Sequence, residues 1–184
     1  MSASTAPAAG ARLRTSLEAY YTRYYRDTLG LPDWQTKVSG RLTEEDVETS
    51  RIQIVAQALG RPLRGLRVLN VGCGTGGYNV AAQRAGASTW GIDASDDAIR
   101  ICELRRALGA GGRYALAAAE ALPFPEGVFD VVYCLSTLEH VESVEAAVRE
   151  MVRVLRPGGA VLLYAPNAWA LYENHYKIFW PPRC

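Results

Sequence analysis

A short apolar run leads into a glycine-rich turn at residues 67–77, which read RVLNVGCGTGG. The apolar residues favour a buried strand, and the glycines favour a sharp turn against which a ligand can lie closely. A helical pattern follows up to Arg84, and a second apolar run over residues 89–93 ends in Asp93. An acid at the end of a second strand is suited to hydrogen-bond a ribose diol. The pattern therefore predicts a site for an adenosine-bearing cofactor.

Apolar strands and amphipathic helices continue to alternate after this unit. Further strands are expected at residues 114–117, 129–134 and 160–164, with helices between them. Such alternation predicts an α/β fold with a Rossmann-like, doubly wound, mostly parallel sheet that has helices on both faces. Ahead of the first strand, helical patterns over residues 12–28 and 43–60, joined by a loop, form an N-terminal helical extension.

These patterns divide the chain into four parts. They are a disordered tail over 1–11, N-terminal helices over 12–60, a cofactor-binding core over 61–166 and an aromatic tail over 167–184.

Composition and charge exclude several classes of function. The 184 residues carry 20 basic and 19 acidic side chains, so no global field is available to hold nucleic acid. No apolar stretch reaches the roughly 20 residues that a membrane-spanning helix needs. The four cysteines form no CxxC pair, which indicates neither a disulfide framework nor a zinc site and favours a reduced, cytoplasmic setting.

Six short motifs occur in a fixed order between the first and fifth expected strands. They stand at residues 68–76, 91–95, 119–124, 129–132, 138–141 and 155–159. Together they resemble class I S-adenosylmethionine-dependent methyltransferases over residues 45–166, and residues 138–141, LEHV, are similar to quinone-type O-methyltransferases. The glycine pattern alone, GxGxxG, also allows NAD.

The resemblance implies S-adenosylmethionine as cofactor and a role for each matching residue. The glycine backbone would bound the methionine part, Asp93 would take the ribose hydroxyls, and the Ala119 amide would reach the adenine. Asn70 and Ala118 depart from the family, which often has acids at both positions. The expected cofactor-binding set is Asn70, Gly72, Cys73, Gly74, Thr75, Gly76, Asp93, Ala94, Ala119, Glu120 and Leu135.

The sequence offers fewer candidate residues for binding the methyl acceptor than for binding the cofactor. His140 follows the fourth strand and is either a general base or a ring that hydrogen-bonds loop backbone and shapes the pocket. Ser136 and Thr137 stand where some relatives have an acid, so no metal site is expected. The aromatic tail either walls an apolar acceptor site or packs as core. Candidate substrate contacts are Tyr24, Trp34, His175 and Tyr176.

The leading function is in-line methyl transfer to a small molecule, most plausibly to a hydroxyl group, with nitrogen and carbon acceptors open. One alternative is a truncated or non-catalytic cofactor-binding module. Another is an NAD-dependent oxidoreductase, which is disfavoured because neither Lys37 nor Lys177 completes a Tyr-x-x-x-Lys relay.

The sheet of the family that the sequence resembles usually has seven strands, and we expect the last two to be missing here. Only 19 residues (184 − 165) follow the fifth strand, three of them prolines, which central strands tolerate poorly. We therefore expect a truncated fold whose open fifth-strand edge is partly covered by the aromatic tail, aggregates, or pairs with a second copy as a homodimer. Part of the acceptor site would then be absent, so cofactor binding would survive while methyl transfer is weak.

Overall fold

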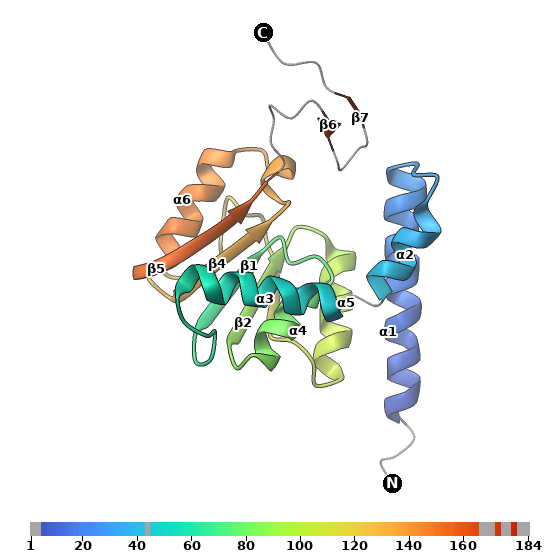
Figure 1. Cartoon of the computed structure of the whole chain (residues 1–184), viewed down its shortest axis with the longest axis horizontal. Helices are drawn as coiled ribbons and strands as arrows, with labels where there is room; N and C mark the ends of the chain where they lie inside the picture. Colours follow the sequence, from blue (N-terminus) through green and yellow to red (C-terminus); the bar gives the residue numbers. More distant parts are fainter. Residues whose placement is uncertain (1–4, 43–44, 166–171, 174–177, 180–184) are drawn as a thin grey trace.

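The computed structural model describes residues 5–42, 45–165, 172–173 and 178–179. A parallel sheet of five strands, in the order β3-β2-β1-β4-β5, lies at its centre (Figure 1). The order reverses between β1 and β4, and a parallel sheet binds ligands at the carboxyl ends of the strands beside such a reversal. The strands are β1 (Arg67–Val71), β2 (Ser88–Asp93), β3 (Arg113–Leu116), β4 (Phe129–Leu135) and β5 (Leu155–Tyr164).

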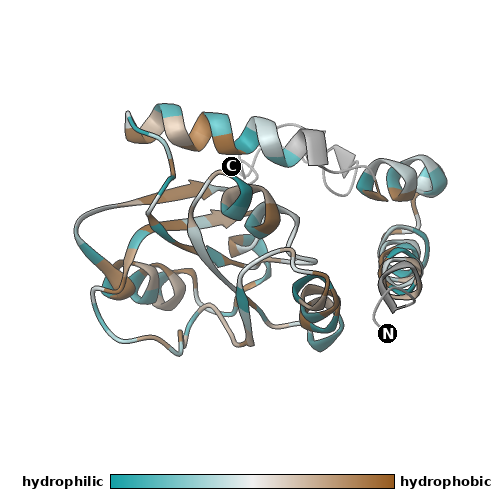
Figure 2. Ribbon diagram, turned by 90° about the horizontal axis from the view of Figure 1, so that it is seen from below, coloured by the Kyte–Doolittle hydropathy of each residue, from teal (hydrophilic) through white to brown (hydrophobic). Residues whose placement is uncertain are grey.

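Helices cover both faces of the sheet, which confirms the predicted doubly wound α/β fold. Helices α3 (Glu45–Leu59) and α4 (Gly77–Arg84) lie on one face and α6 (Val144–Val154) on the other, while α5 (Asp96–Ala107) packs against β2 and β3. Successive strand residues point to opposite faces, so Val68 joins the α3–α4 core and Leu69 joins the α6 core. Hydrophobic colouring follows the central strands in Figure 2.

The N-terminal helices form a cluster of their own beside the sheet (Figure 1). Helix α1 (Thr5–Thr22) runs into a π-helix, η1 (Arg23–Thr28), and α2 (Trp34–Leu42) folds back on α1. Buried side chains from these helices and the η1–α2 connection pack on Ile101 of α5, and these are Leu17, Tyr21, Tyr25, Leu31 and Val38. The extension is thereby joined to the helix that follows β2.

Helix α2 was not predicted, because Gly30, Pro32 and Gly40 indicate a loop. Burial of Val38 and the packing of Leu42 in the N-terminal cluster outweigh the low helix propensity of Gly40. The first helix also begins at Thr5, within the stretch 1–11 that the sequence assigned to a disordered tail.

Strand β5 begins five residues before the expected position at 160. Leu155 already pairs with Phe129, and the register then shifts between Phe129 and Val131. Such a shift absorbs extra residues in one strand, which lets the Pro157–Gly159 stretch lie within the strand.

The described residues beyond β5 do not extend the central sheet. Strands β6 (Tyr172–Glu173) and β7 (Ile178–Phe179) pair antiparallel in a two-stranded sheet of their own. These strands were not predicted, since the tail shows no alternating pattern. The expectation that no strand pair follows the fifth strand is therefore wrong, although β6 and β7 form a sheet separate from the central one among the residues that the structure describes.

No helix within the described ranges is both long enough and apolar enough to cross a membrane.

The buried carboxylate of Asp130, on β4, bonds to residues of the two neighbouring strands, β1 and β5. Its Oδ2 accepts from the backbone N–H of Arg67 at 2.6 Å, and its Oδ1 pairs with Arg156 Nη1 at 2.5 Å. The side chain of Asp130 is only 5% exposed, whereas the two arginines are about half exposed. The acid thus joins the starts of β1, β4 and β5.

We expect Asp130→Ala to lower the free energy of unfolding by about 2–4 kcal/mol, because it leaves the Arg67 N–H and the arginine charges without their acceptor. Urea unfolding measures the loss. The control is Asp96→Ala, which removes an exposed acid paired with Arg100 on α5 and should cost at most about 0.5 kcal/mol. Equal losses in the two variants would contradict a structural role for Asp130.

Candidate functional site

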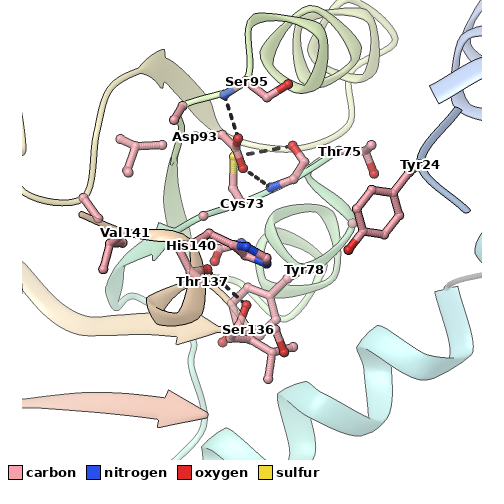
Figure 3. Close-up of a pocket in the computed structure, with 18 of the residues that line it drawn as sticks. Tyr24, Cys73, Thr75, Tyr78, Asp93, Ser95, Ser136, Thr137, His140 and Val141 are labelled. Carbon is pink, nitrogen blue, oxygen red and sulfur yellow. Dashed lines mark hydrogen bonds between the residues drawn. The ribbon is translucent and has the colours of Figure 1, made fainter. Parts of the chain in front are cut away.

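A cavity of about 1170 Å³ opens at the carboxyl ends of β1, β2 and β4. The loop after β1, the ends of β2 and β4, and helices α2, α3 and η1 all contribute to its walls. In Figure 3 Asp93 and Ser95 lie on one side, and Ser136, His140 and Tyr78 lie on the other. The cavity is therefore at the position where a doubly wound sheet binds its ligand.

The glycine loop lies directly against β2. The backbone N–H groups of Gly72 and Cys73 both donate to Ile92 O, at 2.9 and 2.8 Å. Gly72 has a φ of +72°, and a Cβ there would come within 2.1 Å of Thr137 Oγ1. Thr137 Oγ1 in turn donates to Val71 O at 3.2 Å, joining the ends of β1 and β4. Only glycine fits at position 72 in this arrangement.

Asp93 holds the next part of the loop. Its Oδ2 accepts from Gly74 N at 2.8 Å and its Oδ1 accepts from Ser95 N at 2.9 Å (Figure 3). Gly74 has a φ of +51°, and a Cβ added there would meet no protein atom within 4 Å. Because Gly74 lines the cavity, that space is open to a ligand.

Side chains of α5 hydrogen-bond the backbone of the glycine loop. The thiols of Cys73 and Cys102 both reach Gly74 O, at 3.7 and 3.2 Å, and Arg105 Nε donates to Thr75 O at 2.8 Å. Hydrogen bonding with Cys102, followed by burial, raises the pKa of the Cys73 thiol well above its ordinary value. The Cys73 thiol therefore remains protonated and serves as a donor.

Gly76, expected in the cofactor set, does not line the cavity. It is the N-cap of α4, and a side chain there would meet Tyr114 and Cys102. The sequence motif includes it because the helix start requires its left-handed conformation, with a φ of +81°. All the other expected cofactor residues line the cavity.

Two of them are anchored through their side chains. Asn70 is buried, and its Nδ2 donates to Asn79 Oδ1 at 2.8 Å, so its oxygen is the atom suited to accept from a ligand. Glu120 Oε1 accepts from the backbone of Glu142 at 2.8 Å, ahead of α6. Hydrogen bonds from its own backbone, and then from Ser143 and Glu142, hold the pKa of Glu120 below its usual range.

Two residues that follow β4 line the cavity: Ser136, whose backbone is strained, and His140. Ser136 has a φ of +49°, which is uncommon for a residue other than glycine, and its N–H donates to Tyr164 O at 2.8 Å. His140 closes the short helix η2 (Leu138–His140), is exposed and lines the cavity. The turn after β4 thus presents His140 opposite Asp93 (Figure 3).

Four tyrosines of the N-terminal helices line the cavity from outside the sheet. Tyr21 shares a hydrogen bond of 2.8 Å with Thr75 Oγ1, and Arg23 pairs with Asp97 of α5 at 2.9 Å. Burial, together with the Asp93 charge, raises the pKa of Tyr20 to about 12. Tyr24 projects toward the cavity in Figure 3. Of these four tyrosines, the sequence predicts only Tyr24 as a candidate substrate contact.

The structure does not place a further substrate candidate, Trp34, at the cavity. Trp34 does not line the cavity: it packs in the N-terminal cluster, with the Arg26 guanidinium 5.5 Å from its ring. His175 and Tyr176 lie outside the described residues. Conversely, Glu48, Arg51, Tyr78 and Tyr133 line the cavity but belong to no motif, and spacing alone gives no signal for them.

The family model for the methyltransferase domain matches residues 69–163. A ubiquinone biosynthesis O-methyltransferase of Ralstonia nicotianae is 44% identical over 102 residues, which are 54% of this chain and 43% of that protein. The structure of YcgJ from Bacillus subtilis aligns with a TM-score of 0.58 and 28% identity, over 64% of this chain and 50% of that one. The [4+2]-cyclase SpnF aligns with a TM-score of 0.54 and 31% identity, over 61% and 43%.

The chain spans about half the length of the curated relatives it matches. The match to the methyltransferase domain nevertheless covers more than half of the chain and contains the glycine loop, Asp93 and the turn after β4. The chain therefore belongs to the class I S-adenosylmethionine-dependent methyltransferase family.

Proposed function

We propose that this protein transfers a methyl group from S-adenosylmethionine to a hydroxyl group of a small molecule. The observation that carries the proposal is one continuous cavity, which Asp93 and the glycine loop line on one side and His140 on the other. When bound, S-adenosylmethionine supplies an electrophilic methyl group on a sulfonium. The similarity to a ubiquinone biosynthesis O-methyltransferase supports oxygen as the atom methylated.

The residues at the glycine loop fit this cofactor. The Asp93 carboxylate has oxygen lone pairs beyond those used by Gly74 N and Ser95 N, and these can accept from a ribose diol. The open space at Gly74 admits a ligand against bare backbone. Asn70 presents an amide oxygen to an ammonium group, and Ala94 and Ala119 offer an apolar slot for a planar base.

The protein's own part in the reaction is to position the acceptor and take its proton. Alignment of reacting groups contributes up to about 7–11 kcal/mol to a bimolecular step. The tyrosines of α1 and η1 wall the cavity and exclude water. His140 is the group that we assign to hold the hydroxyl proton, because it lines the cavity and an imidazole nitrogen can accept a proton.

The alternative functions use the same cavity for different chemistry. The likeness to a [4+2]-cyclase shows that related folds do not share one reaction, so a non-catalytic or non-methylating role is the second candidate. Binding with no methyl transfer to any hydroxyl acceptor would favour it.

The proposal extends to assembly and location. The outer edge of β5 is where a second copy would pair, since β5 ends the order of the five-stranded sheet and exposes Leu163 and Tyr164. The buried free cysteines Cys73, Cys102 and Cys134 support a reducing compartment such as the cytoplasm.

Gly74→Val should abolish binding of S-adenosylhomocysteine, measured by calorimetry, because the new side chain occupies the space at the loop. The control is Gly109→Val, since Gly109 has a φ of +78°, also meets nothing within 4 Å and lies outside the cavity. Both variants carry the same backbone strain, so a selective loss reports the ligand space. Normal binding by folded Gly74→Val would refute the loop assignment.

Asp93→Ala should weaken S-adenosylhomocysteine by roughly tenfold or more. The variant loses charge-assisted hydrogen bonds, each worth about 1.5–3 kcal/mol, and frees the Gly74 N–H from its acceptor. Asp97→Ala removes a neighbouring acid that does not line the cavity and should bind normally. Equal affinities for the two variants would mean that Asp93 is only a surface acid with no role in cofactor binding.

His140→Ala should lower methyl transfer far more than it lowers cofactor affinity. Labelled methyl transfer to a panel of hydroxyl acceptors gives the first quantity and calorimetry with S-adenosylhomocysteine gives the second. Glu139→Gln changes the exposed neighbour, which does not line the cavity, and should behave as the unmodified protein. If His140→Ala reduces both quantities equally, the ring belongs to the cofactor site.

A further inference from the structure

Two thiols from distant parts of the chain meet beneath the glycine loop. Cys73 follows β1, and Cys102 lies in α5. Both thiols lie within hydrogen-bond distance of the same acceptor, Gly74 O, at 3.7 and 3.2 Å, and they also hydrogen-bond each other. The two sulfur atoms are therefore direct neighbours, which is the first requirement for a disulfide.

Bare backbone around the pair makes room for both sulfur atoms. A Cβ at Gly91, on β2, would come within 2.9 Å of Cys73 Sγ. A Cβ at Gly76, where α4 begins, would come within 3.0 Å of Cys102 Sγ. A side chain at either glycine would push a thiol out of its place. The sequence thus combines two cysteines with two glycines that allow the sulfur atoms to meet.

The two thiols differ in their access to the cavity. Cys73 lines the cavity and is 7% exposed, whereas Cys102 is fully buried and does not line it. The Cys73 sulfur lies next to the Asp93 side chain in Figure 3. A small, uncharged oxidant that enters the cavity therefore meets Cys73 first. An accessible thiol with a second thiol beside it is the arrangement in which oxidation proceeds to a disulfide.

The same two thiols are the donors that hold the carbonyl of Gly74. Within the described part of the chain, no other group donates to Gly74 O. A disulfide has no S–H group, so its formation would remove both donors at once. Loss of these bonds favours a shift of the loop into the open space at Gly74, where the cofactor has to lie.

We propose that Cys73 and Cys102 form a disulfide when a hydroperoxide enters a cavity that holds no cofactor, and that this disulfide weakens the binding of S-adenosylmethionine. The oxidant class is a small hydroperoxide, of which hydrogen peroxide is the simplest. This inference rests on the proposed function, because it concerns the cofactor site of that same reaction. In a reducing compartment both thiols stay free, as they are in the structure.

The reaction with hydrogen peroxide balances in two steps. The Cys73 thiolate attacks one peroxide oxygen and the O–O bond breaks, which gives a sulfenic acid and, with the proton from the thiol, one molecule of water. The Cys102 sulfur then attacks the sulfenic sulfur, the S–O bond breaks, and a second molecule of water leaves. In total the two thiols lose two electrons and two protons, and the peroxide gains them.

The surroundings of the pair make this oxidation slow at neutral pH. Only a thiolate attacks a peroxide, and hydrogen bonding with Cys102, followed by burial, raises the pKa of Cys73. The other ionisable groups that act on the two thiols come from β2, β3, α5 and α1, and they are Asp93, Tyr114, Arg105 and Tyr20. Because a higher pH increases the thiolate fraction, the rate of oxidation should rise between about pH 7 and pH 9.

The test treats reduced protein with hydrogen peroxide, with and without saturating S-adenosylhomocysteine. The remaining thiols are then alkylated and the peptides are mapped by mass spectrometry. Without ligand we expect a pair of peptides joined through Cys73 and Cys102, which dithiothreitol separates. With S-adenosylhomocysteine at about 100 times its Kd, the link should form at least about tenfold more slowly, because the ligand fills the route to Cys73.

Calorimetry measures the consequence for the cofactor site. The oxidised protein should bind S-adenosylhomocysteine about tenfold more weakly than the reduced protein, and dithiothreitol should restore the affinity. Cys73→Ser cannot form the link, so its own affinity should be the same before and after peroxide. Cys102→Ser should give no link and should leave a sulfenic acid at Cys73, which dimedone traps.

Cys134→Ala is the matched control, because Cys134 is also a buried free cysteine but lies on β4 and does not line the cavity. It should form the Cys73–Cys102 link and lose affinity as the unmodified protein does.

The absence of this link in excess peroxide, or a link from Cys73 to Cys134 or Cys184 in its place, would overturn the proposal. A link that leaves the affinity unchanged, or that forms equally fast with bound S-adenosylhomocysteine, would overturn it as well. Failure of the reduced protein to bind S-adenosylhomocysteine would instead refute the proposed function. The peptide map reports the disulfide whether or not the ligand binds, so the two failures are distinguishable.

Discussion

The last two residues of β2 determine where the glycine loop lies. Ile92 O accepts two of the loop's N–H groups and the Asp93 carboxylate accepts a third, so the loop cannot shift without breaking bonds to the sheet. Asp93 also accepts from Ser95 N, at the start of α5. One strand end therefore places both the loop and the next helix. The same carboxylate faces the cavity, which means that the atom suited to a ribose diol is already oriented by the fold.

The N-terminal helices are linked to this loop by a chain of aromatic contacts. Arg41 Nε donates to Tyr25 OH at 2.8 Å, the Arg41 guanidinium lies 5.6 Å from the Tyr21 ring, and Tyr21 bonds Thr75. In the π-helix, Leu29 N donates to Tyr24 O, five residues earlier, so each turn is wider than in an α-helix. The wider turn changes the direction in which successive tyrosine side chains point. Helix α2, the aromatic wall and the cofactor loop thus form one connected unit.

The sequence predicted the elements whose signals are local, and it missed those set by packing. Alternating strands and helices and the glycine loop follow from short-range chemistry and are present. Helix α2 and the early start of β5 depend on partners far along the chain, Ile101 and Phe129 respectively. Gly76 starts a helix and does not line the cavity, a difference that the motif alone does not show. Arg51 and Tyr78 meet only through the fold.

The walls of the cavity differ in charge, and this difference bears on how a ligand can be oriented. Asp93, Glu120 and Glu142 line it from β2 and from the loops around α6, whereas the cationic side chains come from α2 and α3. Hydrogen bonds keep Glu120 ionised, so the acidic side persists below neutral pH. A bound molecule with a positive and a negative group is most stable with the positive group toward the acids. Because the acids come from the sheet's own loops and the cations from helices packed around it, the polarity of the site is a product of the complete fold.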